Sequence, residues 1–291
     1  MNIRKKLIGN KNKLSLKVKK IYRSWSSDQR VLPDFIIIGA QKAGTSSLYS
    51  YLIQHPGILP ALDKEVHFFD SPSNRSQGLS WYRKYFCTMS EKQKLQTKLG
   101  YLPLTGEATP SLLFDLHAPK FVKQTLPNVK IIVLLRDPVE RAFSHYHHNR
   151  RFEGREPLSF EEAIEQEPNR TYDKMKAWQN DENYIDVSIG HYAYIQRGFY
   201  DEQLNRWFKY FNRDNFCILK SEDFFENPQN KLAKVTSFLD LPNYTFEVSK
   251  ISNSGSYSDN EFSDIIQKKL KVKFQEHNEN LCQTLGWSSA W

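Results

Sequence analysis

Short, continuously apolar segments alternate with longer amphipathic segments along most of the chain. Residues 35–38 (FIII) form an apolar, mostly β-branched run, which is typical of a strand buried on both faces of a sheet. Small residues at 39–44 predict a turn, and residues 45–54 predict a helix that Pro56 ends. This order of strand, loop and helix is the opening of an α/β unit.

Two further strand–helix units follow along the chain. Residues 129–135 (VKIIVLL) predict a second buried strand, and residues 138–150 predict a helix with Asp137 as its N-cap. Residues 215–220 predict a third strand, and residues 227–239 predict the helix after it. Strands that alternate with helices favour a parallel sheet. We therefore expect an α/β, P-loop-like three-layer fold with a central parallel sheet and helices on both faces.

Positive charge is concentrated at the N-terminal end of the chain. The formal net charge is +8, of which residues 1–30 carry +9 and the remaining residues −1. Four large apolar residues recur there at helical spacing between lysines, namely Leu14, Val18, Ile21 and Trp25. This pattern predicts either a basic amphipathic helix for an anionic membrane surface or polyanion, or a partly disordered, solvated extension. We divide the chain into a basic tail, 1–30, and a single domain, 31–291.

Composition limits the class of protein. Hydrophobic residues make up 39% of the chain and aromatic residues 14%, which is too much for a disordered protein. The sequence has neither a run of 18 apolar residues nor an apolar stretch after its first basic residues, so we expect no spanning helix and no cleaved signal peptide. The three cysteines are scattered, which suits a reducing compartment. We expect a cytoplasmic protein that contacts a membrane surface through its tail.

A candidate phosphate-binding loop lies between the first predicted strand and helix, at residues 39–47 (GAQKAGTSS). Backbone N–H groups at the start of a helix point outward and attract anions. An ordinary tight β–α turn is the alternative, but it would need the glycines and neither the lysine nor the three hydroxyl residues. We predict that the anion is held by Lys42, Ala43, Gly44, Thr45, Ser46 and Ser47.

This loop differs from the triphosphate-binding P-loop, in which the lysine directly follows the second glycine. Here Thr45 follows Gly44, and Lys42 precedes that glycine by two residues. Asp137 follows a predicted strand, but its neighbour Pro138 indicates a helix cap rather than a partner for Mg²⁺. A metal-dependent P-loop nucleotide kinase is therefore a weaker alternative.

A second candidate anion site lies at residues 135–146 (LRDPVERAFSHY). Arg136 is placed at the carboxyl end of a buried strand, where α/β sheets bind ligands. Ser144 lies about two turns into the helix that follows. An arginine and a serine so placed can bind a second phosphate through charge-assisted hydrogen bonds. An arginine paired with a nearby carboxylate is the alternative.

Together these two segments closely resemble the cofactor signatures of sulfotransferases that use 3′-phosphoadenosine 5′-phosphosulfate (PAPS). Residues 39–48 resemble the 5′-phosphosulfate loop of that family, and residues 135–146 resemble its 3′-phosphate motif. The resemblance extends from about Asp34 to about Trp287. Residues 64–70 (KEVHFFD) also resemble a segment of the heparan sulfate N- and 3-O-sulfotransferases, in which the matching glutamate is regarded as the catalytic base.

The resemblance implies a role for each matching residue. Glu65 would deprotonate the acceptor, and His67 would orient the acceptor or Glu65. Lys42 would stabilise charge on the bridging oxygen as the nucleotide leaves. Arg136, Ser144 and Arg197 would bind the 3′-phosphate. Glu107 would help to shape the acceptor cleft.

The implied enzyme transfers a sulfuryl group from PAPS to a hydroxyl or amine of a carbohydrate, by in-line displacement and without a metal ion. Its other product is adenosine 3′,5′-bisphosphate (PAP). The body of the chain is nearly neutral and lacks the basic stripe that long polyanions need, so we expect a small carbohydrate or glycolipid acceptor and no nucleic acid partner. The non-enzymatic alternative is a module that binds membranes or polyanions through the tail.

Overall fold

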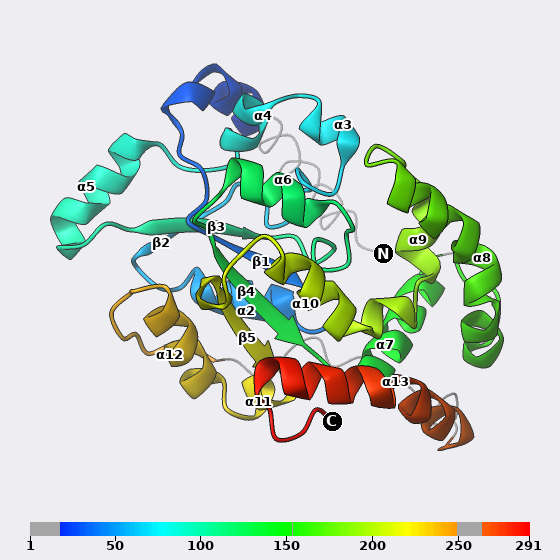
Figure 1. Cartoon of the computed structure of the whole chain (residues 1–291). Helices are drawn as coiled ribbons and strands as arrows, with labels where there is room; N and C mark the ends of the chain where they lie inside the picture. The colour runs from blue at the N-terminus through cyan, green and yellow to red at the C-terminus, as the bar shows by residue number, and fades with distance from the viewer. Residues whose placement is uncertain (1–17, 153, 249–263) are drawn as a thin grey trace, which may run out of the picture.

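A five-stranded parallel sheet forms the centre of the computed structural model, which describes residues 18–152, 154–248 and 264–291 (Figure 1). The strands lie in the order β2-β3-β1-β4-β5, and each neighbouring pair is parallel. Their bounds are β1 (Phe35–Gly39), β2 (Ile58–Pro60), β3 (Leu104–Ala108), β4 (Lys130–Leu135) and β5 (Phe216–Lys220). The three strands predicted above are β1, β4 and β5.

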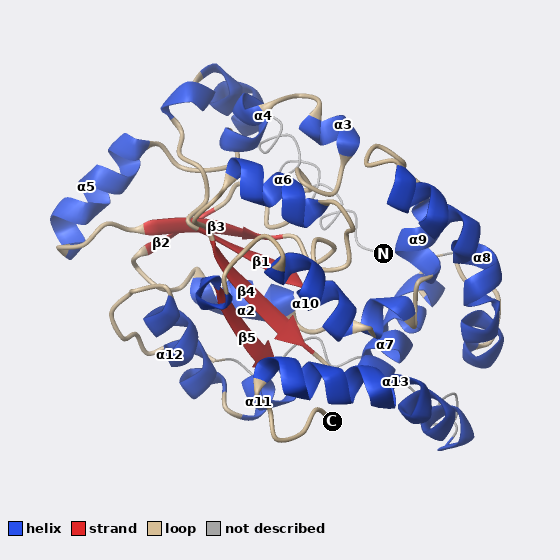
Figure 2. Cartoon of the chain, viewed as in Figure 1, coloured by secondary structure: helices blue, strands red, loops and turns tan. Residues whose placement is uncertain are grey.

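The chain changes direction across the sheet at β1. It leaves β1 through α2 (Thr45–Leu52) toward β2, and it later leaves β3 through α6 (Ala118–Thr125) toward β4 on the other side of β1. Right-handed crossovers that run in opposite directions place α2 and α6 on opposite faces, with α12 (Pro228–Phe238) beside α2. The predicted three-layer α/β fold is therefore confirmed (Figure 2). In open α/β sheets such a change of direction marks the place where ligands bind, which here is at the carboxyl ends of β1 and β4.

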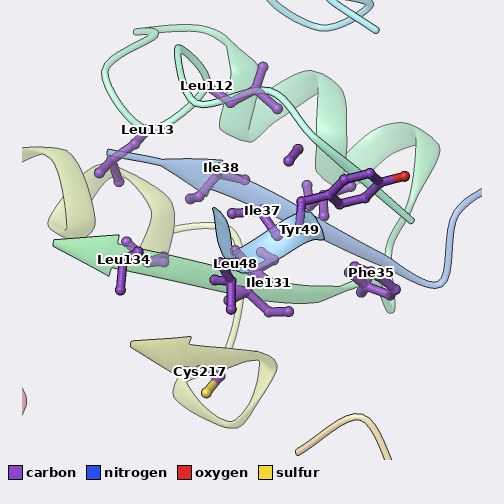
Figure 3. Close-up of a cluster of buried hydrophobic side chains, with 14 of the residues drawn as sticks. Phe35, Ile37, Ile38, Leu48, Tyr49, Leu112, Leu113, Ile131, Leu134 and Cys217 are labelled. Atoms are coloured by element: carbon purple, nitrogen blue, oxygen red, sulfur yellow. The ribbon is translucent and has the colours of Figure 1, made fainter. Parts of the chain in front are cut away.

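The central strands are buried on both faces. Phe35, Ile37 and Ile131 have no exposed surface, and Figure 3 shows them packed with Leu48 and Tyr49 of α2. This double burial explains why the strands appear in the sequence as continuous apolar runs. Burying each large apolar side chain stabilises the fold by roughly 1.5–3 kcal/mol. The strands therefore hold the loops at their ends in fixed positions.

Helices fill the long connections between the strands and the chain after β5. They are α3 (Pro72–Arg75), α4 (Leu79–Arg83), α5 (Met89–Leu99), α7 (Pro138–Arg150), α8 (Phe160–Asn180), α9 (Val187–Tyr192), α10 (Tyr200–Phe208), α11 (Ser221–Glu226) and α13 (Asp264–Leu285), with short 3-10 turns at Ser27–Gln29, Gln196–Gly198 and Arg213–Asn215. α7 begins as predicted, because Asp137 accepts hydrogen bonds from the backbone N–H groups of Val139 and Glu140 at 2.8 and 3.3 Å. α11 was not predicted, since it is too short to show a helical period.

Residues 18–25 are helical, and two of their basic side chains turn toward the domain. Lys20 forms an ion pair with Asp63, and Arg23 donates a hydrogen bond to the carbonyl oxygen of Tyr85 at 3.3 Å. The apolar side chains face solvent, with exposed fractions of 58% at Val18, 59% at Ile21 and 83% at Trp25. The amphipathic helix therefore presents its apolar stripe outward.

The last residue of the predicted tail packs against the domain. Arg30 is buried, and its Nη1 donates to the carbonyl oxygen of Phe86 at 2.7 Å. In the ranges that the structure describes, no helix combines the length and the apolar character needed to cross a membrane. Leu14 and the tail residues before Val18 lie outside the described residues, so what the sequence predicts for them stays a prediction.

Candidate active site

The glycine loop joins β1 to α2, as the sequence predicts. Gly44 is the N-cap of α2 with a φ of 96°, and a Cβ at this position would lie 2.5 Å from the ring of Phe225. A Cβ at Gly39 would lie 2.6 Å from Cβ of Leu113. Close packing therefore requires glycine at both ends of the loop. The loop leads directly into the N-terminus of α2, where unpaired N–H groups and the helix dipole attract an anion.

Arg136 brings the second motif against this loop. It follows the last residue of β4, and its Nη1 donates to the carbonyl oxygen of Lys42 at 3.3 Å. Burial lowers the pKa of Lys42, and the charges of Arg151, Arg136 and Arg141 lower it further. The two predicted phosphate sites are thus neighbours, but the alternative stated for Arg136 is also met, since its Nη2 donates to Glu140 Oε2 at 3.3 Å.

Buried polar groups on α7 extend this positive region. Arg141 has no exposed surface and donates through Nη2 to the carbonyl oxygen of Tyr194, while its Nε and Nη1 have no partner among the described residues. His145 is also buried with Nδ1 unpartnered, and burial followed by the charge of Arg141 holds its pKa well below the ordinary value. Ser144 is buried between them in the sequence. Buried donors without partners are costly, so Nε and Nη1 of Arg141 fit a ligand that carries phosphate groups.

Glu65, His67 and Asp70 form a hydrogen-bonded row, here called the carboxylate–histidine row. His67 Nδ1 lies 2.9 Å from Asp70 Oδ2, and His67 Nε2 lies 3.4 Å from Glu65 Oε2. The hydrogen bonds to Asp70 and then Glu65 raise the pKa of His67 to about 10. Since both ring nitrogens face carboxylates, His67 is an imidazolium that donates to both.

Lys64 connects the carboxylate–histidine row to the glycine loop. Its Nζ donates to Glu65 Oε1 at 2.6 Å and to Ser46 Oγ at 2.6 Å. Burial acts to raise the pKa of Glu65, but the hydrogen bonds from His67 and Lys64 outweigh it and lower that pKa to about 2. Glu65 is therefore fully ionised at neutral pH.

Glu107 supports the row from within β3. Its Oε2 accepts the backbone N–H of Val66 at 3.2 Å, and its Oε1 accepts the hydroxyl of Tyr82 at 2.5 Å. The side chain has no exposed surface, and burial raises the pKa of Glu107. Glu107 thus holds the loop of Glu65 in place without reaching the surface itself, and its part in an acceptor cleft stays a prediction.

A cavity of about 190 Å³ lies on the Asp70 side of the row. Arg197 is on its wall, with the guanidinium 4.5 Å from the centre of the Phe114 ring. Burial, followed by the charge of Arg141, lowers the pKa of Arg197 to about 9. Arg197 therefore borders both the positive group of α7 and the cavity. Its contact with a 3′-phosphate stays a prediction.

The predicted residues of the glycine loop and of the carboxylate–histidine row lie with Arg136 on one side of the sheet. The structure adds three residues to this group that were not predicted to belong to the site: Lys64, Asp70 and Arg141. All three lie inside segments that the sequence singles out, but only their contacts and burial reveal what they do. Within the described ranges, His, Cys, Asp and Glu side chains form no group of three that would suit a metal. The metal-free reaction stays a prediction.

Comparisons with known proteins point to the same class of enzyme. The family model described as "Sulfotransferase domain" matches residues 32–281. Heparan sulfate glucosamine 3-O-sulfotransferase 5 of Mus musculus is 30% identical over 211 residues, which cover 72% of this chain and 54% of that protein. Membrane-associated sulfotransferase kil1 of Dictyostelium discoideum is 28% identical, over 89% of this chain and 66% of its own length. The chain thus spans about half the length of the mouse relative.

A solved structure extends the likeness to the fold. The crystal structure of a sulfotransferase from Alicyclobacillus acidocaldarius has a TM-score of 0.65 and 26% identity, and the match covers 88% of this chain and 96% of that chain. The family match contains the glycine loop, the motif of Arg136 and the carboxylate–histidine row. Because the family model matches residues 32–281, which is most of the chain, the chain belongs to the sulfotransferase family.

Proposed function

We propose that this enzyme transfers a sulfuryl group from PAPS to a hydroxyl or amine of a carbohydrate acceptor. The observation that supports the proposal is the hydrogen bond from Arg136 to the backbone of Lys42, which brings the two predicted anion-binding motifs into contact. A nucleotide with phosphates on both sides of its ribose suits such a pair of sites. Lys42, Thr45, Ser46 and Ser47 would hold the 5′ end, and Arg136 and Ser144 would hold the 3′-phosphate.

The residues of the site divide the chemical work between them. PAPS supplies the sulfuryl group. Glu65 accepts the proton that the acceptor loses as its oxygen or nitrogen bonds to sulfur. The bond from that sulfur to the bridging phosphate oxygen breaks, and Lys42 stabilises the negative charge left on this oxygen, an effect worth roughly 3–4 kcal/mol. His67, fixed by Asp70, orients the Glu65 carboxylate.

That the acceptor is a carbohydrate is a separate part of the proposal. It is supported by the names of the relatives, which include the mouse heparan sulfate glucosamine 3-O-sulfotransferase 5. The nearly neutral body of this chain favours a smaller carbohydrate or a glycolipid over a long polyanion.

A thermal-shift comparison tests the cofactor. Bound ligand raises the apparent stability of a protein by mass action, so PAP should raise the melting temperature more than AMP does, with or without EDTA. Equal shifts for PAP and AMP would contradict the 3′-phosphate site. Binding that requires Mg²⁺ would favour the nucleotide kinase instead.

We also propose that residues 18–25 and the basic tail contact an anionic membrane surface. Three observations support this contact: the outward apolar stripe, the charge of +9 over residues 1–30, and a relative named as membrane-associated. A cytoplasmic location, with the enzyme resting on the membrane surface, is part of the same proposal.

A further inference from the structure

A buried carboxylate on α8 holds the segment of chain that carries Arg197. Glu167 is 2% exposed, and its carboxylate accepts the backbone N–H groups of Ile195 at 2.6 Å and of Gln196 at 3.0 Å. These two residues directly precede Arg197. Backbone N–H groups at the start of a helical turn have no partner within the turn, so Glu167 caps the 3-10 turn at Gln196–Gly198 from a distant part of the chain.

The same segment also contacts the predicted 3′-phosphate motif. The hydroxyl of Tyr200 donates to the carbonyl oxygen of Arg136 at 2.9 Å. A Cβ at Gly198 would lie 2.9 Å from Cβ of Pro138, the first residue of α7, so the turn packs tightly against the start of that helix. Residues 195–200 are therefore fixed between two anchors, which are Glu167 on α8 and the beginning of α7.

The side chain of Arg197 depends on this backbone for its position. Arg197 is buried, its guanidinium lies 4.5 Å from the centre of the Phe114 ring, and its Nε has no partner among the described residues. Contact with an aromatic face sets the guanidinium less exactly than a paired carboxylate would. The place that the guanidinium reaches is thus decided by where the turn begins, which Glu167 determines.

The charge of Glu167 is costly where it lies. Burial raises the pKa of Glu167 to about 7, although the N–H groups of Gln196 and Ile195 and then the charges of Arg141 and Lys273 oppose this rise. A neutral amide could accept one of the two N–H groups without placing a charge in the interior. Only a carboxylate offers an acceptor to both, and this match fixes the direction of the turn as well as its position.

We propose that Glu167 is a positioning residue of the cofactor site, which sets the turn so that Arg197 reaches the same 3′-phosphate as Arg136. The inference rests on the proposed function and adds a residue to it. Glu167 lies in none of the segments that resemble the family's motifs, and only its contacts reveal it.

Glu167→Gln tests the proposal, because it keeps the size of the side chain and turns an amide N–H₂ group toward one of the two backbone N–H groups. At pH 8, where Glu167 of the unaltered protein is ionised, calorimetry should show that PAP binds the variant about ten-fold more weakly. AMP, which lacks the 3′-phosphate, should bind both proteins alike. KM for PAPS should rise without a loss of kcat, since the 3′-phosphate is remote from the bond that breaks.

Two further variants control for a general loss of structure. Glu165→Gln, two residues away on α8, removes an exposed carboxylate that pairs with Lys269 and should bind PAP like the unaltered protein. Glu167→Asp keeps the charge but cannot reach both N–H groups, so it should show the same selective loss if Glu167→Gln does not fold. An equal loss of PAP and AMP binding overturns the proposal, and so does unchanged PAP binding.

A double-mutant cycle shows whether Glu167 acts through Arg197. Arg197→Met alone should weaken PAP binding by about ten-fold or more, and adding Glu167→Gln to it should cause no further loss. Losses that multiply would mean that Glu167 acts elsewhere, and the proposal would fail. If PAP and AMP bind the unaltered protein equally, the proposed function itself fails, so the two failures are distinguishable.

Discussion

The ammonium group of Lys64 lies 2.6 Å from the Glu65 carboxylate, and the same nitrogen lies 2.6 Å from the hydroxyl of Ser46. One side chain thus ties the proposed base to the proposed cofactor loop. A carboxylate with a pKa of about 2 is a weak base at neutral pH. A phosphate group beside Ser46 would attract Lys64 away from Glu65, so cofactor binding would raise the pKa of the base.

Replacing Lys64 should change the pH dependence of the reaction. Lys64→Met removes a hydrogen bond and a charge that lower the pKa of Glu65, so this pKa should rise from about 2 toward its ordinary 4.5. Because Glu65 acts in its ionised form, kcat/KM for PAPS, which reports the cofactor-free enzyme, should fall in the variant as the pH drops toward about 4, where the unaltered enzyme holds its rate. Initial rates across this range measure the effect. Lys94→Met, at an exposed position of α5, is the control. If the rate of Lys64→Met falls at the same acidic pH as the rate of the unaltered enzyme, the effect of Lys64 on the pKa of Glu65 is contradicted.

Removing the carboxylate of Glu65 should abolish most of the chemistry and leave nucleotide binding in place. Glu65→Gln keeps the shape of the side chain but cannot accept the acceptor's proton, so sulfuryl transfer should fall by about 100- to 10,000-fold. The rise in melting temperature with PAP should match that of the unaltered protein. A variant that keeps its transfer rate would rule out Glu65 as the base.

The carboxylate–histidine row should make stability depend on pH. The pKa of folded His67 is raised from 6.5 to about 10, first by its hydrogen bond to Asp70, so the row contributes stability that is complete below pH 6.5 and is lost as the pH rises through 10. Asp70→Asn removes the largest cause of this shift. Melting temperatures between pH 6.5 and 10 should therefore decline less in the variant, and NMR titration of His67 should show a lower pKa. An equal decline would contradict this account.

Arg141 should cost the ligand-free enzyme stability. Its guanidinium is fully buried with two nitrogens unpartnered in the described residues, and an unpaired buried donor costs about 1–3 kcal/mol. Arg141→Met should therefore raise the melting temperature of the free protein by about 2–4 °C or more and reduce the additional rise caused by PAP. Both melts come from the same thermal-shift experiment. A lower melting temperature without PAP would mean that the bond to Tyr194 outweighs this cost.

The outward stripe on residues 18–25 should control membrane binding. Ile21→Asp combined with Trp25→Asp places charge on the exposed apolar face, and sedimentation with phosphatidylglycerol vesicles should fall by about ten-fold or more. Val272→Asp, on the exposed side of α13, is the matched control and should sediment like the unaltered protein. If the double variant, the Val272→Asp control and the unaltered protein sediment equally, the exposed apolar face of residues 18–25 does not bind the membrane.

The sequence predicts those parts of the fold that local forces decide. β1 and β4 are buried on both faces and so appear as unbroken apolar runs, and the cap at Asp137 depends only on its immediate neighbours. β2 has three residues, too few to show any period. The contact of Lys64 with Ser46 and the burial of Glu107 depend on packing between distant segments. Residue type alone cannot specify such contacts.

The carboxylate–histidine row and the cavity wall are built from different stretches of chain. The row is held by β3, since Ala108 donates to the carbonyl oxygen of Lys64 at 2.9 Å and Glu107 accepts from Val66. Much of the wall comes instead from residues 178–190. Substitutions in residues 178–190 can therefore reshape the cavity while the contacts that hold the Glu65 loop stay intact. A chimera that receives residues 178–190 from another family member would keep the carboxylate–histidine row of this chain.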